Sequence, residues 1–134
     1  MNGDYPDKIA LVHIENRKVL LALNSGSDKW YLPGGGREPG ETDEDTLIRE
    51  VKEELNVDII PETVNYHDVL EAQAHSAPEG KMTRVTCYTA SFNGELKASS
   101  EIARIAFFNY SQKDLTSAPT QLLLNNLKTK DVID

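Results

Sequence analysis

Cysteine is nearly absent from this sequence, since Cys87 is the only one in 134 residues. A single cysteine excludes an intrachain disulfide and is typical of a reducing compartment, so we expect a cytoplasmic protein. Cys87 lies in an apolar stretch that resembles a strand, which favours a buried structural thiol over a nucleophile. The stability of the fold must therefore come from a noncovalent core.

Long apolar runs are also lacking, because no stretch approaches the about 20 apolar residues that cross a bilayer. The first five residues do not resemble a signal peptide. Positive charge is scarce too, with 14 lysines and arginines against 22 aspartates and glutamates and a net charge of −8. Without a block of basic residues, we expect no binding to a nucleic-acid polymer, and without a long apolar run we expect no association with a membrane.

The rest of the composition is ordinary for a soluble globular protein, with 39% hydrophobic and 27% charged residues. A chain of this length can form one well-packed core, so we expect a single domain over residues 1–134. The three histidines, His13, His67 and His75, are scattered without metal-ligand spacing, and we expect surface or core positions for them.

Three glutamates stand out in the first half of the chain. Glu50, Glu53 and Glu54 are spaced i, i+3 and i+4, so on a helix their carboxylates project from one face. Like charges placed in this way repel, and a hard divalent cation that prefers oxygen ligands, Mg²⁺ or Mn²⁺, would compensate them. The alternative is a solvated acidic face, which would be preferred if the three glutamates stood alone.

The residues around these glutamates predict a helix over about 43–55. Thr42 is the expected N-cap, and Asp45 completes a short capping box. Leu47, Val51 and Leu55 recur at i, i+4 and i+8 and supply an apolar stripe for the core. One face of the helix is then buried, and the adjacent face directs the carboxylates into a cleft.

A run of three glycines, Gly34, Gly35 and Gly36, precedes this helix. Backbone without Cβ atoms can approach a ligand closely. Its N–H groups can bind phosphate oxygens, and its carbonyls can join a metal shell. Glycine loops are common in ordinary turns, so the run gains meaning only beside the acidic helix.

Residues 35–57 together resemble the Nudix box, Gly-x5-Glu-x7-Arg-Glu-U-x-Glu-Glu-x-Gly-U with U apolar, which is the signature of the Nudix hydrolases, here of the MutT-like type. Gly35, Glu41 and the run that begins at Arg49 match every position except one, where Asn56 replaces the final glycine. Asparagine is the residue other than glycine that best tolerates the left-handed conformation of a helix C-cap, so the departure is mild.

The resemblance implies an α+β fold, an α/β/α sandwich with a mixed β-sheet and a catalytic loop–helix–loop. It implies hydrolysis of a phosphoanhydride bond in a nucleoside triphosphate or another nucleoside diphosphate derivative, by a water that Mg²⁺ or Mn²⁺ activates. A different class is a nucleotide-sensing or regulatory module without turnover, but such relatives usually lose box carboxylates. A third, an RNA-decapping relative, needs a basic surface.

The same resemblance assigns roles to residues of the box. Glu50 and Glu54 are the expected principal metal ligands, with the carbonyl of Gly35 as a further ligand. Glu53 is expected to join them or to bind a second ion. Glu53 and Glu54 are also expected in catalysis, and Arg49 is expected to orient a carboxylate through charge-assisted hydrogen bonds. An ordinary ion pair between Arg49 and Glu53 is the simpler interpretation, and both can hold.

Further residues are expected to organise the loop, to act as the general base or to bind the substrate. Glu41 is expected to organise the loop. Glu101 is the preferred candidate for a general base outside the box, with Glu95 second, although an exposed loop carboxylate is the simpler interpretation of each. The backbone of residues 34–36 and the side chain of Arg84 are the expected substrate-binding groups.

Subgroup markers say less about the substrate. ADP-ribose hydrolases carry a marker proline, and dinucleoside polyphosphate hydrolases carry a marker tyrosine. Neither marker is present here, because the matching positions contain Ala72 and residues 73–75. The coenzyme A signature is also missing. Ser117 and Ala118 stand where mutator-type members carry a purine-reading asparagine. Aromatic residues could stack on a base, although core packing is the more common role, and they are Tyr66, Tyr88, Phe107 and Phe108.

A coarse reading predicts six or seven strands and two helices. The expected strands cover residues 9–14, 19–23, 30–32, 58–60, 64–75, 82–92 and 102–109, with turns at 15–17, 77–81 and 93–94. Pro119 is expected to open a final helix that faces Leu122, Leu123 and Leu127 inward. Homodimers are common among small proteins of this type, and the sequence specifies no interface.

Overall fold

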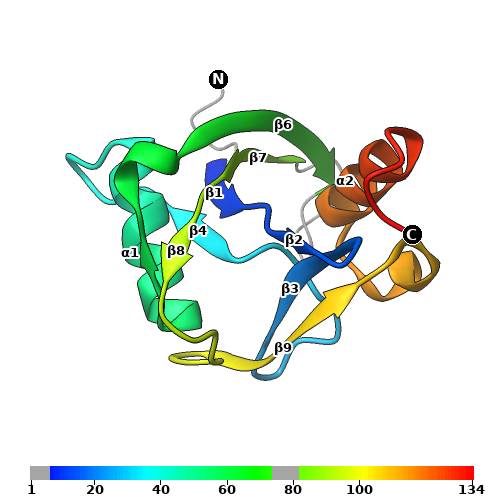
Figure 1. Ribbon diagram of the computed structural model, residues 1–134, viewed down its shortest axis with the longest axis horizontal. Coiled ribbons are helices and arrows are strands. Elements are labelled where there is room, and N and C mark those ends of the chain that lie inside the picture. The colour runs from blue at the N-terminus through cyan, green and yellow to red at the C-terminus, as the bar shows by residue number, and fades with distance from the viewer. Residues whose placement is uncertain (1–6, 74–81) are drawn as a thin grey trace.

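The computed structural model describes residues 7–73 and 82–134. Its helices lie on opposite sides of a layer of strands, with α1 at the left and α2 at the right of Figure 1. The central sheet has the order β4 (Gly34–Gly36), β1 (Asp7–Leu11), β7 (Met82–Thr89) and β6 (Asn65–Gln73). β1 runs parallel to β7, whereas β4 and β6 pair antiparallel with their neighbours, so the sheet is mixed, as predicted.

Two smaller groups of strands complete the layer. The first has the order β2 (Ile14–Glu15), β3 (Lys18–Asn24) and β9 (Ile102–Phe108), and the second pairs β5 (Asp58–Ile59) with β8 (Phe92–Asn93). Short 3₁₀ turns, η2 (Pro61–Thr63) and η3 (Tyr110–Leu115), connect the longer elements.

Alternation along β1 divides the core between the two helices. Ile9 and Leu11 point toward α1 (Asp43–Leu55), and Ala10 points toward α2 (Ala118–Thr129). On the α1 side, Leu47, Val51 and Leu55 have no exposed surface. Each fully buried side chain of this kind contributes roughly 1.5–3 kcal/mol to stability. The result is the helix–sheet–helix sandwich that the resemblance implies.

α1 begins and ends where the sequence predicts. The Thr42 hydroxyl accepts the Asp45 N–H at 3.1 Å, and the Asp45 carboxylate accepts the Thr42 N–H at 3.2 Å, which completes the capping box. At the other end Asn56 has φ 62° and ψ 31°, the left-handed conformation expected of a C-cap. Capping at both ends gives a rigid platform for the carboxylates.

Several predicted elements differ from the observed ones. Residues 30–32 form no strand, because Trp30 and Tyr31 make only isolated bridges to Thr116 and Ala22. Residues 9–14 divide between β1 and β2, which belong to different sheets, so the turn predicted at 15–17 joins only β2 to β3. The predicted strand 82–92 likewise divides between β7 and β8. The turn predicted at 77–81 lies outside the described residues.

The prediction that Leu122 faces the core from α2 is wrong. Leu122 is 38% exposed, whereas Leu124 is fully buried beside Leu123 and Leu127. The buried residues of α2 are Pro119, Thr120, Leu123, Leu124 and Leu127, which recur at helical spacing, so position 122 falls outside the buried stripe. Neither α1 nor α2, the α-helices of the described residues, is long and apolar enough to cross a membrane.

Candidate active site

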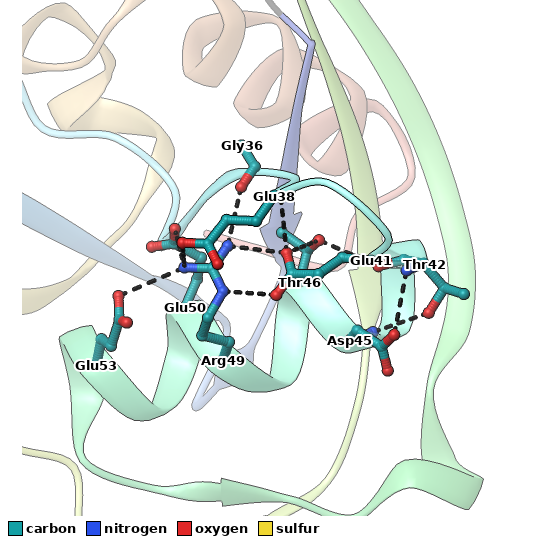
Figure 2. Close-up of polar contacts among 9 residues, drawn as sticks. All are labelled: Gly36, Glu38, Glu41, Thr42, Asp45, Thr46, Arg49, Glu50 and Glu53. Atoms are coloured by element: carbon teal, nitrogen blue, oxygen red, sulfur yellow. Dashed lines mark hydrogen bonds and ion pairs between the residues drawn. The ribbon is translucent and has the colours of Figure 1, made fainter.

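Arg49 organises the segment that connects the glycine run to α1 (Figure 2). Its Nε donates to Glu41 Oε2 at 2.7 Å, and its Nη2 donates to Glu41 Oε1 and to the Gly36 carbonyl, both at 3.0 Å. Its Nη1 donates to Glu50 Oε2 at 2.9 Å. One guanidinium therefore ties the loop, through Glu41 and Gly36, to a carboxylate of the helix.

Glu41 behaves as a loop organiser, as predicted. Besides Arg49, its carboxylate accepts the Glu38 N–H at 2.9 Å and the Thr46 hydroxyl at 2.8 Å. The hydrogen bonds from Arg49, followed by the one from Glu38, lower the pKa of Glu41 from 4.5 to about 2. The carboxylate is therefore ionised throughout the physiological range, and its hydrogen-bonding capacity is used by the loop.

A cleft of about 480 Å³ opens beside this loop. Its walls include the glycine run, Glu50 and Glu54 from α1, and Glu101, which precedes β9. β1, which lies between β4 and β7, forms the floor with Lys8 and Ala10. The far wall comes from β7 and the beginning of α2, and it contains Thr83, Val85, Ser117, Pro119 and Thr120. The cleft thus has an acidic end at β4 and a mostly uncharged end between β7 and α2.

Two glycines let the backbone approach these carboxylates. Gly34 has φ +149°, its N–H donates to Glu54 Oε1 at 3.0 Å, and a Cβ there would meet the Ile9 carbonyl. A Cβ on Gly35 would lie 2.4 Å from both Cδ and Oε2 of Glu50. Glycine at position 35 leaves room for the Glu50 carboxylate, and glycine at position 34 leaves room for the backbone of β1, which accounts for part of the sequence pattern.

Burial controls the charge state of Glu50 and Glu54. Desolvation raises the pKa of Glu50, opposed by Arg49, and raises that of Glu54 to about 8, opposed by the Gly34 N–H. The charge of Glu101 adds to the rise at both. Glu54 has only 6% of its surface exposed, so a cation is needed to stabilise its ionised form at neutral pH.

The donor chemistry at the acidic end fits a hard divalent cation. Glu50 and Glu54 supply carboxylate oxygens one helical turn apart, and the backbone of Gly35 passes beside Glu50. As placed, Arg49 holds Glu50 and the Gly34 N–H holds Glu54. Among the described residues no three His, Cys, Asp or Glu side chains lie close enough together to form a complete metal-binding cluster.

Other predicted residues lie farther from the cleft. The side chain of Glu53 is 52% exposed and lies 3.6 Å from Arg49, outside the cleft walls. Arg84 points to the opposite face of β7 from Thr83 and Val85, pairs with Glu71 at 3.2 Å, and does not line the cleft. The exposed Glu95 does not line it either.

The aromatic side chains pack or hydrogen-bond outside the cleft. Phe108 is buried in the α2-side core, and Phe107 packs against the α1-side core. The Tyr88 hydroxyl donates to Asp43 Oδ2 at 2.6 Å, and the 61% exposed Tyr66 meets the Tyr88 ring edge-on. None of these four lines the cleft. Packing, the more common role considered for them, accounts for Phe107 and Phe108.

Sequence reasoning missed several cleft residues, of which Lys8, Asn24 and Tyr31 are the most polar. The lysine breaks the apolar pattern of β1, which is a signal that could have been used. Asn24 lies at an irregularity in the pairing of β3 with β9, and sequence gives no sign of that. Its Oδ1 is buried and, within the described residues, has no hydrogen-bond partner.

The family model described as "NUDIX domain" matches residues 4–124 of this chain. The human 8-oxo-dGDP phosphatase NUDT18 is 57% identical over 59 residues, which cover 42% of this chain and 18% of that protein. The ADP-ribose pyrophosphatase of Methanocaldococcus jannaschii is 29% identical over 101 residues, which cover 74% of this chain and 58% of that protein. The chain therefore spans less than two thirds of the length of either relative.

Solved structures agree on the fold. The solution structure of the E. coli ORF135 protein superposes with a TM-score of 0.72 at 23% identity and covers 95% of this chain and 92% of that one. At this identity the likeness concerns the arrangement of helices and strands alone.

Proposed function

The chain belongs to the NUDIX family, and from that premise we propose that it is a pyrophosphohydrolase dependent on a divalent metal ion. The substrate class is a nucleoside triphosphate or another nucleoside diphosphate derivative, and the bond broken is a phosphoanhydride. The names of the human and archaeal relatives, an 8-oxo-dGDP phosphatase and an ADP-ribose pyrophosphatase, both fit this class.

One observation carries the proposal. The buried carboxylate of Glu54 and the half-buried one of Glu50 lie at the glycine-lined end of a cleft. Buried negative charge next to an anionic phosphate would repel the substrate unless a cation lies between them. When bound, Mg²⁺ or Mn²⁺ would offset the phosphate charge and lower the pKa of the attacking water.

The residues of this chain would bind the metal ion, orient its ligands and contact the phosphates. Glu50 and Glu54 would hold the ion, with the Gly35 carbonyl as a further ligand and Glu53 as a more exposed one. Arg49 orients Glu50 through the 2.9 Å hydrogen bond and keeps the loop closed on the helix. The glycine-run backbone can contact phosphate oxygens because no side chain intervenes.

Glu101 is the proposed general base. It lines the same cleft from the loop before β9, across from α1. A hydrogen bond from Ser100 and a backbone hydrogen bond lower its pKa, so it is ionised at neutral pH and can accept a proton from water.

The test is a substrate panel with Mg²⁺ or Mn²⁺. Purified protein is assayed for phosphate and pyrophosphate release from nucleoside diphosphates and triphosphates, nucleotide sugars, ADP-ribose and dinucleoside polyphosphates. We expect turnover of one class, its loss with EDTA, and its recovery when metal is restored. Glu54→Gln should lower kcat by about 10²-fold or more, because it removes a charge that holds the metal.

Glu44→Gln is the matched control, since Glu44 is an exposed glutamate on the same helix. Equal activity of the Glu54 and Glu44 variants would refute the assignment of the site. A folded protein that binds metal and nucleotide yet turns over nothing in the panel would point to a sensing module.

A further inference from the structure

Lys8 occupies the floor of the cleft between its two ends. On β1 it pairs in register with Gly36 of β4 on one side and with Val85 of β7 on the other. Alternation places its side chain on the same face as Ala10, and both residues line the cleft. Because the strand order is β4, β1, β7, Lys8 stands between the glycine run and the wall formed by Thr83 and Val85.

Among the described residues, Lys8 is also the one basic residue that lines the cleft. The charged residues that line it within the described part of the chain are Glu50, Glu54, Glu101 and Lys8. The nearby arginines Arg37 and Arg49 already form ion pairs with carboxylates. Arg37 pairs with Asp7 at 2.5 Å and with Asp43 at 2.6 Å, and Arg49 pairs with Glu41 and Glu50.

The ammonium of Lys8, by contrast, makes no ion pair or side-chain hydrogen bond with any residue in 7–73 or 82–134. The residue is exposed and lines the cleft. In a protein of net charge −8, a lysine in the same cleft as three carboxylates is a specific attraction for an anionic ligand.

The order of groups in a nucleotide matches the order of groups in the cleft. The acidic end at β4 suits the phosphoanhydride and its metal ion, and the uncharged end suits a nucleoside, with the buried hydroxyls of Ser117 and Thr120 3.0 Å apart. The phosphate that adjoins the nucleoside must lie between these parts, where Lys8 is.

We propose that Lys8 binds the substrate phosphate adjoining the nucleoside and so positions the phosphoanhydride bond at the acidic end. The proposal rests on the proposed function, because it assumes a nucleotide in this cleft. Lys8 lies on the opposite face of the sheet from the α1 core. Its role is direct contact with the substrate, so removing its charge should change the affinity for the substrate.

The experiment compares Lys8→Met with Lys18→Ala. Methionine keeps the apolar stem of Lys8 and removes its charge, and Lys18 is an exposed lysine of β3 outside the cleft. Binding of guanosine, adenosine, GMP and AMP is measured by calorimetry with Mg²⁺ at two salt concentrations. These probes contain no phosphoanhydride bond, so the measurement needs no turnover.

We expect Lys8→Met to weaken binding of both monophosphates roughly tenfold, the size of a charge-assisted hydrogen bond, and to leave the nucleosides unchanged. The loss should shrink at high salt. Lys8→Arg should keep most of the affinity because it retains the charge. With the substrate found in the panel, KM should rise by a similar factor and kcat should stay within about twofold.

Three outcomes overturn the proposal. The Lys8 and Lys18 variants could bind monophosphates equally well. Nucleosides and monophosphates could lose affinity equally, which would mean that Lys8 contacts the base. Wild-type protein could fail to bind either monophosphate. Failure of the proposed function is separate, since it is an absence of turnover across the panel and leaves the binding comparison intact.

Discussion

The carboxylate of Glu50 occupies the space that a side chain on Gly35 would need. A Cβ at position 35 would lie 2.4 Å from Glu50 Cδ, whereas a Cβ on the adjacent Gly36 would meet nothing within 4 Å. The first glycine of the box is therefore a spatial requirement of the carboxylate that follows it fifteen residues later.

Gly35→Ala should therefore displace Glu50 and lower the affinity for Mg²⁺ or Mn²⁺ by about 10–100-fold, the usual effect of disturbing the orientation of a ligand. Gly36→Ala should leave that affinity nearly unchanged. Metal titration by calorimetry, alongside the metal dependence of turnover, measures both. Equal behaviour of the two alanine variants would remove Glu50 from the metal site.

Glu101→Gln should lower kcat by about 10²–10⁴-fold, because a positioned base contributes that much to proton transfer. Its metal affinity should be unchanged, which distinguishes a base from a ligand. Glu95→Gln is the control, since this exposed carboxylate lies outside the cleft walls. If Glu101→Gln instead weakened metal binding as strongly as Gly35→Ala, Glu101 would be a ligand.

The ion pair of Glu41 with Arg49 predicts a pH dependence of stability. The folded pKa of Glu41 is about 2, below its ordinary 4.5, so its ionised form favours the folded state. That stabilisation is complete above pH 4.5 and is lost as the pH falls toward 2. Urea unfolding should show Glu41→Gln less stable than wild type at pH 7, with a difference that narrows below pH 4.5. A constant difference down to pH 2.5 would contradict this origin.

Asn56 offers a test that separates stability from chemistry. At φ 62° alanine is strained, so Asn56→Ala should lower the free energy of unfolding by about 1 kcal/mol. Asn56→Gly, which restores the usual box residue, should not lower it. Neither variant should change kcat, because the residue caps the helix and lies outside the cleft walls. A lower kcat in the glycine variant would give Asn56 a role beyond capping.

Sequence alone predicted the parts of the site that depend on local spacing. The range of α1, the Thr42 capping box and the position of Asn56 follow from interactions within one helix, and all three were found. The placement of Gly35 beside Glu50 was expected only through the resemblance, because it depends on how the loop folds back.

What sequence did not predict depends on pairing between distant segments. Arg84 and Thr83 are adjacent in the chain, yet the alternation of β7 sends one to Glu71 and the other to the cleft. Lys8 meets Gly36 and Val85 through register with two strands that lie far away in sequence. Leu122 was misplaced because the stripe of α2 is set by Thr120, a polar residue buried by packing. A pattern of neighbouring residues in the sequence cannot predict these contacts, because they join distant segments of the chain.

The alternation of β1 also bears on how this protein can change over generations. Ile9 supports the core beneath α1, and its neighbour Lys8 faces the cleft. Point substitutions at position 8 can alter ligand preference while the hydrophobic packing at position 9 stays intact. Deletion of one residue within the strand would exchange the two faces at once, exposing isoleucine and burying lysine. Ligand preference can therefore change through substitutions in β1, whereas a deletion in this strand would disrupt the core.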